Sequence, residues 1–421
     1  MSRKLTIYKI DNWNTRVSKK SLNLRIKRRH KKYTNPFKHK DKKRREHEYL
    51  KSKITYNEEI ERFCSVNNIS RWKESDRPIK FDESFCLFEN PDSVLRTLLE
   101  MLHRAKVSQK MTRLRYAGKV SFGALYLVDN LCWEIAKKRR WNVICENISD
   151  IEREKLSKLR SMSSSSYESV NANMINERVR ITRKDDPKAD QSYKVKSKDI
   201  TDMVQNAIRE TKSDQKFELP FEAYQAINST IGEHFDNIIL HAPNAEIGIL
   251  CGFYDKDAKE ITVLIYNFGK TIYESFGDDS LPEQMKSVIL EIIENHAKKN
   301  FFIGSRQFTP ENALTLLAVQ EGISSRVKFD KTRGHGLIDF IEHCFNLSTG
   351  TRVVLISGNT AVKFDNKYQV GKKWLFDRER RVIAMNEAND IYEKPDSSYV
   401  INLNINFPGV LIETTIPLKQ L

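Results

Sequence analysis

The 421-residue sequence lacks any run of about 18 apolar residues, the length that a membrane-crossing helix requires. No apolar stretch follows its basic N-terminus, so it also lacks the pattern of a secretory signal. We therefore expect a cytoplasmic protein with no membrane association. With 39% hydrophobic and 30% charged residues, the chain is long enough for two or three domains with buried cores.

Cysteine is scarce, and its six positions are scattered without a C-x-x-C pair. No local cluster of cysteine and histidine has the spacing of zinc ligands. We expect reduced, mostly buried thiols, as is usual in the cytoplasm. The six residues are Cys64, Cys86, Cys132, Cys145, Cys251 and Cys344.

Acidic residues are rare in one part of the chain, which explains the net charge of +16. Residues 1–50 contain 18 Lys/Arg against 4 Asp/Glu, a local balance of +14, densest over residues 25–45. Such a segment is expected to be an extended tail. Trp13, Tyr33 and Phe37 add aromatic faces on which unpaired bases can stack. The tail therefore indicates a nucleic-acid partner, DNA or RNA, and the alternative is a solubilising arm.

Residues 55–150 have the pattern of a small α/β module. The apolar spacing predicts helices over 93–107 and 122–140, and short strands over 113–118 and 141–147. Strands that alternate with helices in this way favour an α/β arrangement.

Residues 151–215 are charged and polar, which predicts a linker or a peripheral helical connector. Apolar runs return in residues 216–421. We predict strands over 246–255, 261–269, 351–358 and 410–418, with helices over 281–299 and 311–321 between them.

A helix predicted over residues 221–242 has two distinct faces. The apolar arc, expected to face a sheet, comprises Tyr224, Ile227, Ile231, Phe235 and Ile238. A polar arc follows i, i+4, i+8 spacing with Glu233, Asn237 and His241. The Asn237 amide oxygen can ligate Mg²⁺, and the Glu233 carboxylate can orient or deprotonate water. The alternative is the solvated side of an amphipathic helix.

Two glycine-bearing segments follow. "YNFGKTI" (266–272) ends a predicted strand with Gly269, and "RGHGLIDFIEHC" (333–344) opens a predicted helix with Gly334 and Gly336. Glycines at the start of a helix let the backbone approach a phosphate closely and leave N–H groups available at the positive helix end.

This ordered set resembles the GHKL ATPase superfamily over residues 216–421. The resemblance implies an α+β chain whose C-terminal domain is a two-layer α/β sandwich, a mixed sheet with helices on one face. It implies that ATP and Mg²⁺ bind there, with residues 275–332 as a lid. Glu233 would be the general base, Asn237 the Mg²⁺ ligand, and His241 is similar to anti-sigma-type kinases. The remaining nucleotide contacts would be Asn267, Gly269, Thr271, Arg333, Gly334, His335, Gly336 and Leu337.

Three positions depart from the family's pattern. Asn267 stands where an aspartate usually accepts a hydrogen bond from the adenine amino group, and an amide can also donate. Thr271 replaces a second glycine, and Gly409-Val410 replaces a Gly-Thr pair on the last strand.

The region around 80–150 resembles STAS domains more faintly. In that comparison Ser121, just before the predicted helix, would be a phosphorylatable serine. The alternative is that Ser121 is an N-cap of the helix.

Three functions fit these observations. The chain could be an ATP-driven conformational switch that hydrolyses ATP and contacts nucleic acid through its tail. It could instead be an anti-sigma-type Ser/Thr protein kinase, or a nucleic-acid-binding protein with a degenerate nucleotide pocket. A protein partner is expected in the first two cases, and a homodimer is compatible with them.

Overall fold

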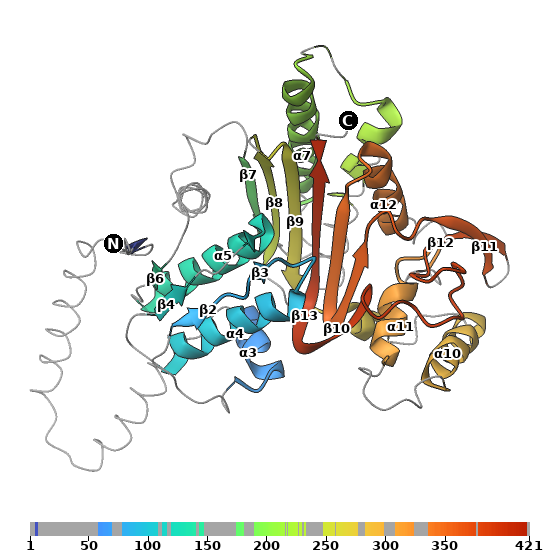
Figure 1. Ribbon diagram of the computed structural model, residues 1–421, viewed down its shortest axis with the longest axis horizontal. Coiled ribbons are helices and arrows are strands. Elements are labelled where there is room, and N and C mark those ends of the chain that lie inside the picture. Colours follow the sequence, from blue (N-terminus) through green and yellow to red (C-terminus); the bar gives the residue numbers. More distant parts are fainter. Residues whose placement is uncertain are drawn as a thin grey trace, which may run out of the picture. The chain divides into compact units, whose positions relative to one another are not determined.

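The chain forms two compact units, drawn in the computed structural model of Figure 1. The structure describes residues 5–6, 58–69, 78–107, 112–115, 119–139, 143–146, 174–180, 189–214, 216, 218–225, 227–229, 231–232, 247–256, 258–276, 283–298, 308–323, 336–375 and 378–418. The first unit comprises Met1–Glu83, Thr97–Gly118 and Tyr126–Ser163, and the second comprises Ser84–Arg96, Lys119–Leu125 and Ser164–Leu421.

The first unit contains a four-stranded mixed sheet in the order β1-β6-β4-β2. Its strands are β1 (Leu5–Thr6), β2 (Ile79–Lys80), β4 (Thr112–Arg115) and β6 (Val143–Glu146), and the helices of this part of the chain are α3 (Glu58–Val66), α4 (Pro91–Val107) and α5 (Phe122–Arg139). Strands β4 and β6 are parallel, so α5 is the crossover that such a pair requires. The predicted strand–helix–strand order is confirmed.

The second unit is built on a five-stranded sheet in the order β10-β13-β9-β8-β7 (Figure 1). Its strands are β7 (Met174–Arg180), β8 (Ile247–Asp255), β9 (Glu260–Phe268), β10 (Arg352–Phe364) and β13 (Val400–Pro417). The four strands predicted in this region are confirmed, and β10 and β13 extend well beyond the predicted bounds. The α+β class is therefore confirmed.

The expectation of a mixed sheet in this unit is wrong for the described strands, because all four pairings are antiparallel. Strands β8 and β9 are joined by a short turn at residues 256–259, and two strands joined so closely can pair only antiparallel.

One face of the sheet packs against helices α7 (Ala189–Lys212) and α12 (Gly336–Leu347). Residues 221–232 contribute to the same core, where Ile227 and Ile231 are buried. The predicted apolar arc is confirmed at these two positions, whereas Phe235 and Ile238 lie outside the described residues. The sheet contributes mainly Leu250, Ile261, Val263, Ile265 and Ile416 to this core.

The opposite face is also buried, which corrects the expectation that only one face is covered. The start of α5 lies against it, where the Phe122 ring stacks on Phe253 at 4.0 Å between centroids. Every residue of β9 from Ile261 to Phe268 is buried. A strand covered on both faces becomes apolar along its whole length, and "ITVLIYNF" has that composition.

The stretch predicted to be a connector, residues 151–215, contains strand β7 and helix α7. Strand β7 is at the sheet edge, where polar side chains are tolerated. Helix α7 buries residues at i, i+3, i+4, i+7 and i+8 spacing within an otherwise charged sequence. These residues are Ile200, Met203, Val204, Ala207 and Ile208.

The stretch expected to be a lid, residues 275–332, contains two predicted helices that are both confirmed, α10 (Glu283–Lys298) and α11 (Pro310–Leu317). Helix α11 is buried from Asn312 to Leu317 and is therefore part of the core. Its N-cap is Thr309, which forms a capping box with Asn312.

None of the described helices is both long and apolar enough to span a bilayer.

Candidate nucleotide site

The predicted site residues fall into two groups. Asn267, Gly269, Thr271, Gly336 and Leu337 belong to the described residues. Glu233, Asn237, His241, Arg333, Gly334 and His335 lie outside them, so their roles remain predictions.

Asn267 is the last but one residue of β9 and is only 2% exposed. It pairs with Val410 of β13, and the Val410 N–H donates a hydrogen bond to Asn267 Oδ1 at 2.9 Å. Strand alternation places Asn267 on the same face as Val263 and Ile265, the face covered by α7 and α12. Because its oxygen is engaged, the side chain offers its Nδ2 donors to a ligand.

Gly409 lies opposite Phe268 and adopts a φ of +145°, which favours glycine. A Cβ atom at this position would collide with the Asn267 carbonyl oxygen and lie 2.8 Å from the Gly269 nitrogen. The Gly269 N–H donates to the Pro408 carbonyl at 3.0 Å. The close approach of the two chain segments therefore requires glycine at position 409.

Ser357 connects β13 to the start of helix α9 (Ile272–Phe276) through two hydrogen bonds, and it was not predicted from the sequence. Its Oγ donates to the Gly409 carbonyl at 2.9 Å and accepts from the Ile272 N–H at 2.8 Å. The register between β10 and β13 shifts just after Ser357, so a β-bulge irregularity aims the hydroxyl inward. A glycine within a predicted strand often marks a β-bulge, so Gly358 directly after Ser357 could have indicated this irregularity.

Thr271 is buried and acts as the N-cap of the short helix α9 (Ile272–Phe276). The Glu274 N–H donates to Thr271 Oγ1 at 3.1 Å, and the Thr271 N–H donates to Glu274 Oε2 at 2.8 Å. This is a capping box, for which "TIYE" is the sequence signature. The Thr271 hydroxyl therefore caps helix α9.

Helix α12 begins at Gly336, as the glycine motif predicted. Leu337, Ile272 and Val410 all pack against the same buried cluster. The first turn of α12 thus shares a core with the start of α9, just after β9, and with the middle of β13. The backbone N–H groups at a helix start form a positive end that can bind an anion.

Two carboxylates near this corner were not predicted. The Asn359 N–H donates to Glu311 Oε1 at 2.9 Å, and Gly358, at a φ of +56°, leaves room for that side chain. Burial and the charge of Glu274 raise the pKa of Glu311, against the opposing effect of the Asn359 N–H.

Ser121, the phosphorylation candidate, is the N-cap residue of α5. Its Oγ accepts a hydrogen bond from the Ala124 N–H at 3.3 Å. This geometry corresponds to the alternative role predicted for it.

Glu413 is a buried carboxyl on the sheet face that the start of α5 covers. It is 3% exposed, and its Oε2 has no hydrogen-bond partner in the part of the chain that the structure describes. Burial raises the pKa of Glu413 to about 8, Arg352 opposes this shift, Glu260 adds to it, and the Gly123 N–H opposes it. A Cβ atom at Gly123 would collide with this carboxyl group.

Cys64, Cys251 and Cys344 are buried free thiols, which confirms the prediction at these positions. Burial raises the pKa of Cys251 and Cys344, so both thiols stay protonated.

No protein-family model, no curated protein and no solved structure matches this chain. Its own residues and contacts therefore carry the functional inference.

Proposed function

We propose that residues 216–421 bind Mg²⁺–ATP in the manner of GHKL ATPases and act as a nucleotide-driven switch. The observation that carries the proposal is the shared core of three separate motifs. Ile272 is the last residue of the first glycine segment, Leu337 belongs to the second, and Val410 pairs with Asn267. All three pack against one cluster. An ATP site of this type needs these segments at one end of the sheet.

The corner fits a phosphate ligand. Helix α12 presents its N-terminal end, which begins at Gly336. Arg333, Gly334 and His335 directly precede that end in the sequence. ATP supplies the phosphate to be cleaved, and Mg²⁺ supplies the charge that neutralises it.

Two residues of the polar arc would act on the bound nucleotide. Asn237 would hold the cation through its amide oxygen, and Glu233 would orient and deprotonate the attacking water. Both assignments rest on spacing and resemblance. They are supported by the burial of Ile227 and Ile231, which holds the segment that directly precedes Glu233 in the core of the sheet.

Arg381 supports the switch. It forms ion pairs with Glu321 at 3.2 Å and with two α12 residues, Asp339 at 2.5 Å and Glu342 at 2.9 Å. Burial lowers the pKa of Arg381, but the three carboxylates raise it by more. The net effect is a raised pKa, so the guanidinium stays charged. Residues 324–335, which separate Glu321 from α12, would form the nucleotide-responsive segment. A nucleotide that binds one arrangement of this segment more tightly shifts the equilibrium toward it.

The first test measures binding of Mg²⁺–ATP by titration calorimetry and by thermal shift. Nucleotide at 100 times its Kd should stabilise the folded state by about 2.7 kcal/mol. Neither heat nor stabilisation would contradict the proposal.

The second test separates binding from turnover. Glu233→Ala should keep ATP binding and reduce hydrolysis by roughly two to four orders of magnitude, the effect of losing a general base. Asn237→Ala should weaken Mg²⁺-dependent binding. Glu222→Ala changes an exposed carboxylate in the same helical segment and should leave both unchanged. With γ-labelled ATP, free phosphate supports an ATPase, whereas label on protein supports the kinase alternative.

A further inference from the structure

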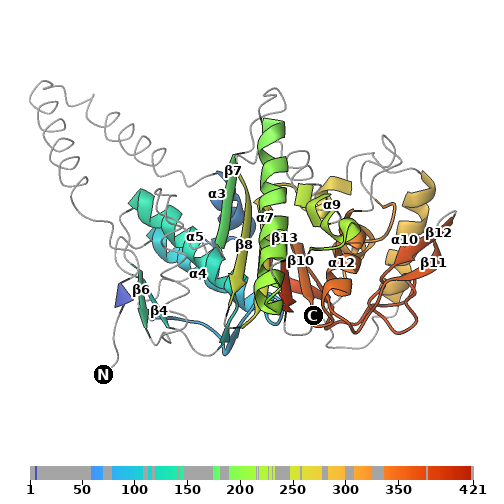
Figure 2. The same ribbon diagram turned by 90° about the horizontal axis from the view of Figure 1, so that it is seen from above.

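A basic hairpin with an exposed tryptophan stands apart from the candidate nucleotide site. Strands β11 (Gly371–Leu375) and β12 (Arg378–Val382) form a separate two-stranded sheet. The hairpin projects at the right-hand edge of the molecule in Figures 1 and 2, away from the five-stranded sheet. It is part of the long excursion between β10 and β13.

The two faces of the hairpin differ. Leu375, Arg380 and Val382 share one face and are buried against the body of the unit. Trp374 points from the other face and is 73% exposed, the highest value among the exposed large hydrophobic side chains. Lys372 is on the outward face with it, two residues away on the same strand.

Some of the basic side chains of the hairpin do not take part in ion pairs with the described part of the protein. Its described residues include five basic side chains and one acidic, Glu379. Arg380 and Arg381 are engaged with Glu321 or α12. The other three are exposed and have no ion-pair partner in the described part of the chain, and these are Lys372, Lys373 and Arg378.

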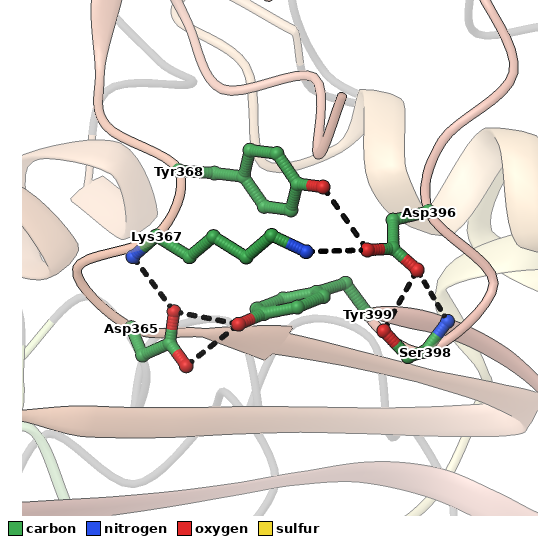
Figure 3. A network of polar contacts seen from close by, with 6 residues as sticks. All are labelled: Asp365, Lys367, Tyr368, Asp396, Ser398 and Tyr399. Atoms are coloured by element: carbon green, nitrogen blue, oxygen red, sulfur yellow. Dashed lines mark hydrogen bonds and ion pairs between the residues drawn. The ribbon is translucent and has the colours of Figure 1, made fainter. Parts of the chain in front are cut away.

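A network of polar contacts lies at the base of the excursion, as Figure 3 shows. Lys367 lies between the rings of Tyr368 and Tyr399, 4.9 and 5.0 Å from their centroids, and pairs with Asp396 at 2.8 Å. The Tyr399 hydroxyl donates to Asp365, with distances of 2.9 and 2.8 Å to its two oxygens. These contacts join the start of the excursion to its end, so the hairpin is held on a fixed support.

We infer that the β11–β12 hairpin is a binding site for single-stranded nucleic acid. The Trp374 ring stacks on an unpaired base, and Lys372, on the same face, contacts a flanking phosphate. The register places Lys373 and Arg378 on the other face of the hairpin, where they add positive charge beside the strand, and pairs Trp374 with Glu379. Every base has a flat face, so an exposed aromatic ring amid basic side chains binds without sequence preference. The buried Arg380 and the half-buried Arg381 hold the hairpin, whereas Lys372 has no ion-pair partner among the described residues and is available to the anionic strand.

The test uses the full chain and fluorescence anisotropy with labelled oligouridine and oligothymidine over a range of salt concentrations. Trp374→Ala should weaken binding about 5- to 150-fold, the loss expected for one base–aromatic stack. Trp374→Phe should retain most of the affinity. Lys372→Ala should reduce the slope of log affinity against log salt by about 0.7, the value for one phosphate contact.

Matched controls are available elsewhere on the surface. Phe221 is 72% exposed, so Phe221→Ala removes an equally accessible ring. The double variant Lys198→Ala, Lys216→Ala removes two exposed lysines outside the hairpin. Both controls should bind oligonucleotide as the unaltered chain does. The proposal is overturned if the hairpin variants also bind normally, or if they lose only binding to anionic phospholipid vesicles.

A crosslinking experiment separates the hairpin from the basic tail. Oligonucleotides with photoreactive 4-thiouridine should crosslink to the peptide that contains Trp374, and mass spectrometry identifies it. Crosslinks confined to residues 1–50 would overturn the proposal. Neither experiment contains ATP, so the outcome is independent of the proposed nucleotide site.

Discussion

Glu413→Gln should change how the stability of the protein depends on pH. The Glu413 carboxyl is buried in the middle of β13, and burial raises its pKa to about 8 from an ordinary value of 4.5. Because the folded-state pKa is the higher one, the folded protein holds the proton more tightly than the unfolded chain. The associated stability is complete below about pH 4.5 and is lost as the pH rises through about 8.

The magnitude follows from these two values. Each pKa unit corresponds to about 1.4 kcal/mol, so the full difference is about 5 kcal/mol. About 3–4 kcal/mol of this stability contribution is lost as the pH rises from about 5 to about 8, a range in which the protein can be studied. Glutamine has nearly the same shape and does not titrate in this range, so the variant lacks this contribution.

The assay is urea denaturation at several pH values in parallel for the unaltered chain and Glu413→Gln. Taking the difference at each pH cancels the other titrating groups. The free energy of unfolding of the variant, relative to that of the unaltered chain, should rise by about 3–4 kcal/mol between pH 5 and pH 8. Glu387→Gln alters an exposed carboxylate and should show no such trend. A difference for Glu413→Gln that stays constant with pH would refute the reasoning.

Three further substitutions test the corner of the sheet and the contacts of α12. Gly409→Ala should lower the free energy of unfolding by about 2–4 kcal/mol, because the added Cβ collides with the Asn267 backbone. Gly232 has open space around it, so Gly232→Ala should leave the free energy of unfolding unchanged in the same denaturation assay. Arg381→Met should cost about 1–3 kcal/mol because it leaves three partly exposed carboxylates without their common partner, whereas an equal loss for Arg378→Met would contradict this. Asn267→Asp should shift the ATP/GTP affinity ratio about tenfold toward ATP in calorimetry, since a carboxylate only accepts hydrogen bonds; an unchanged ratio would argue against contact with the base.

The elements that sequence predicted well are those with a local signal. Helices α4 and α5 and strands β8 and β9 are continuous apolar patterns bounded by polar or turn residues. Strand β7 was missed because an edge strand needs little apolar surface. Helix α7 was expected only as a peripheral connector, one of two alternatives, because the surrounding charge dominated the composition, and its place in the core was not predicted.

The candidate site was predicted less completely because its contacts join distant parts of the chain. The glycine positions 269, 336 and 409 could be marked from sequence, but Ser357 acquires its role only when β10 pairs with β13. Thr271 illustrates a competition between two patterns. Its place in a glycine motif suggested a ligand contact, whereas the capping box with Glu274 gives it a structural role.

The way the two units share the N-terminal segments limits how this protein can be divided. Residues 84–96 and 119–125 belong to the second unit although they precede most of it in the chain. A fragment that starts at residue 216 would lose β7 and α7 and would uncover Phe253, on which the Phe122 ring stacks. A newly exposed apolar sheet face favours aggregation. Tests of the proposed nucleotide site should therefore use the whole chain, because a cut at residue 216 would remove part of the core of the second unit.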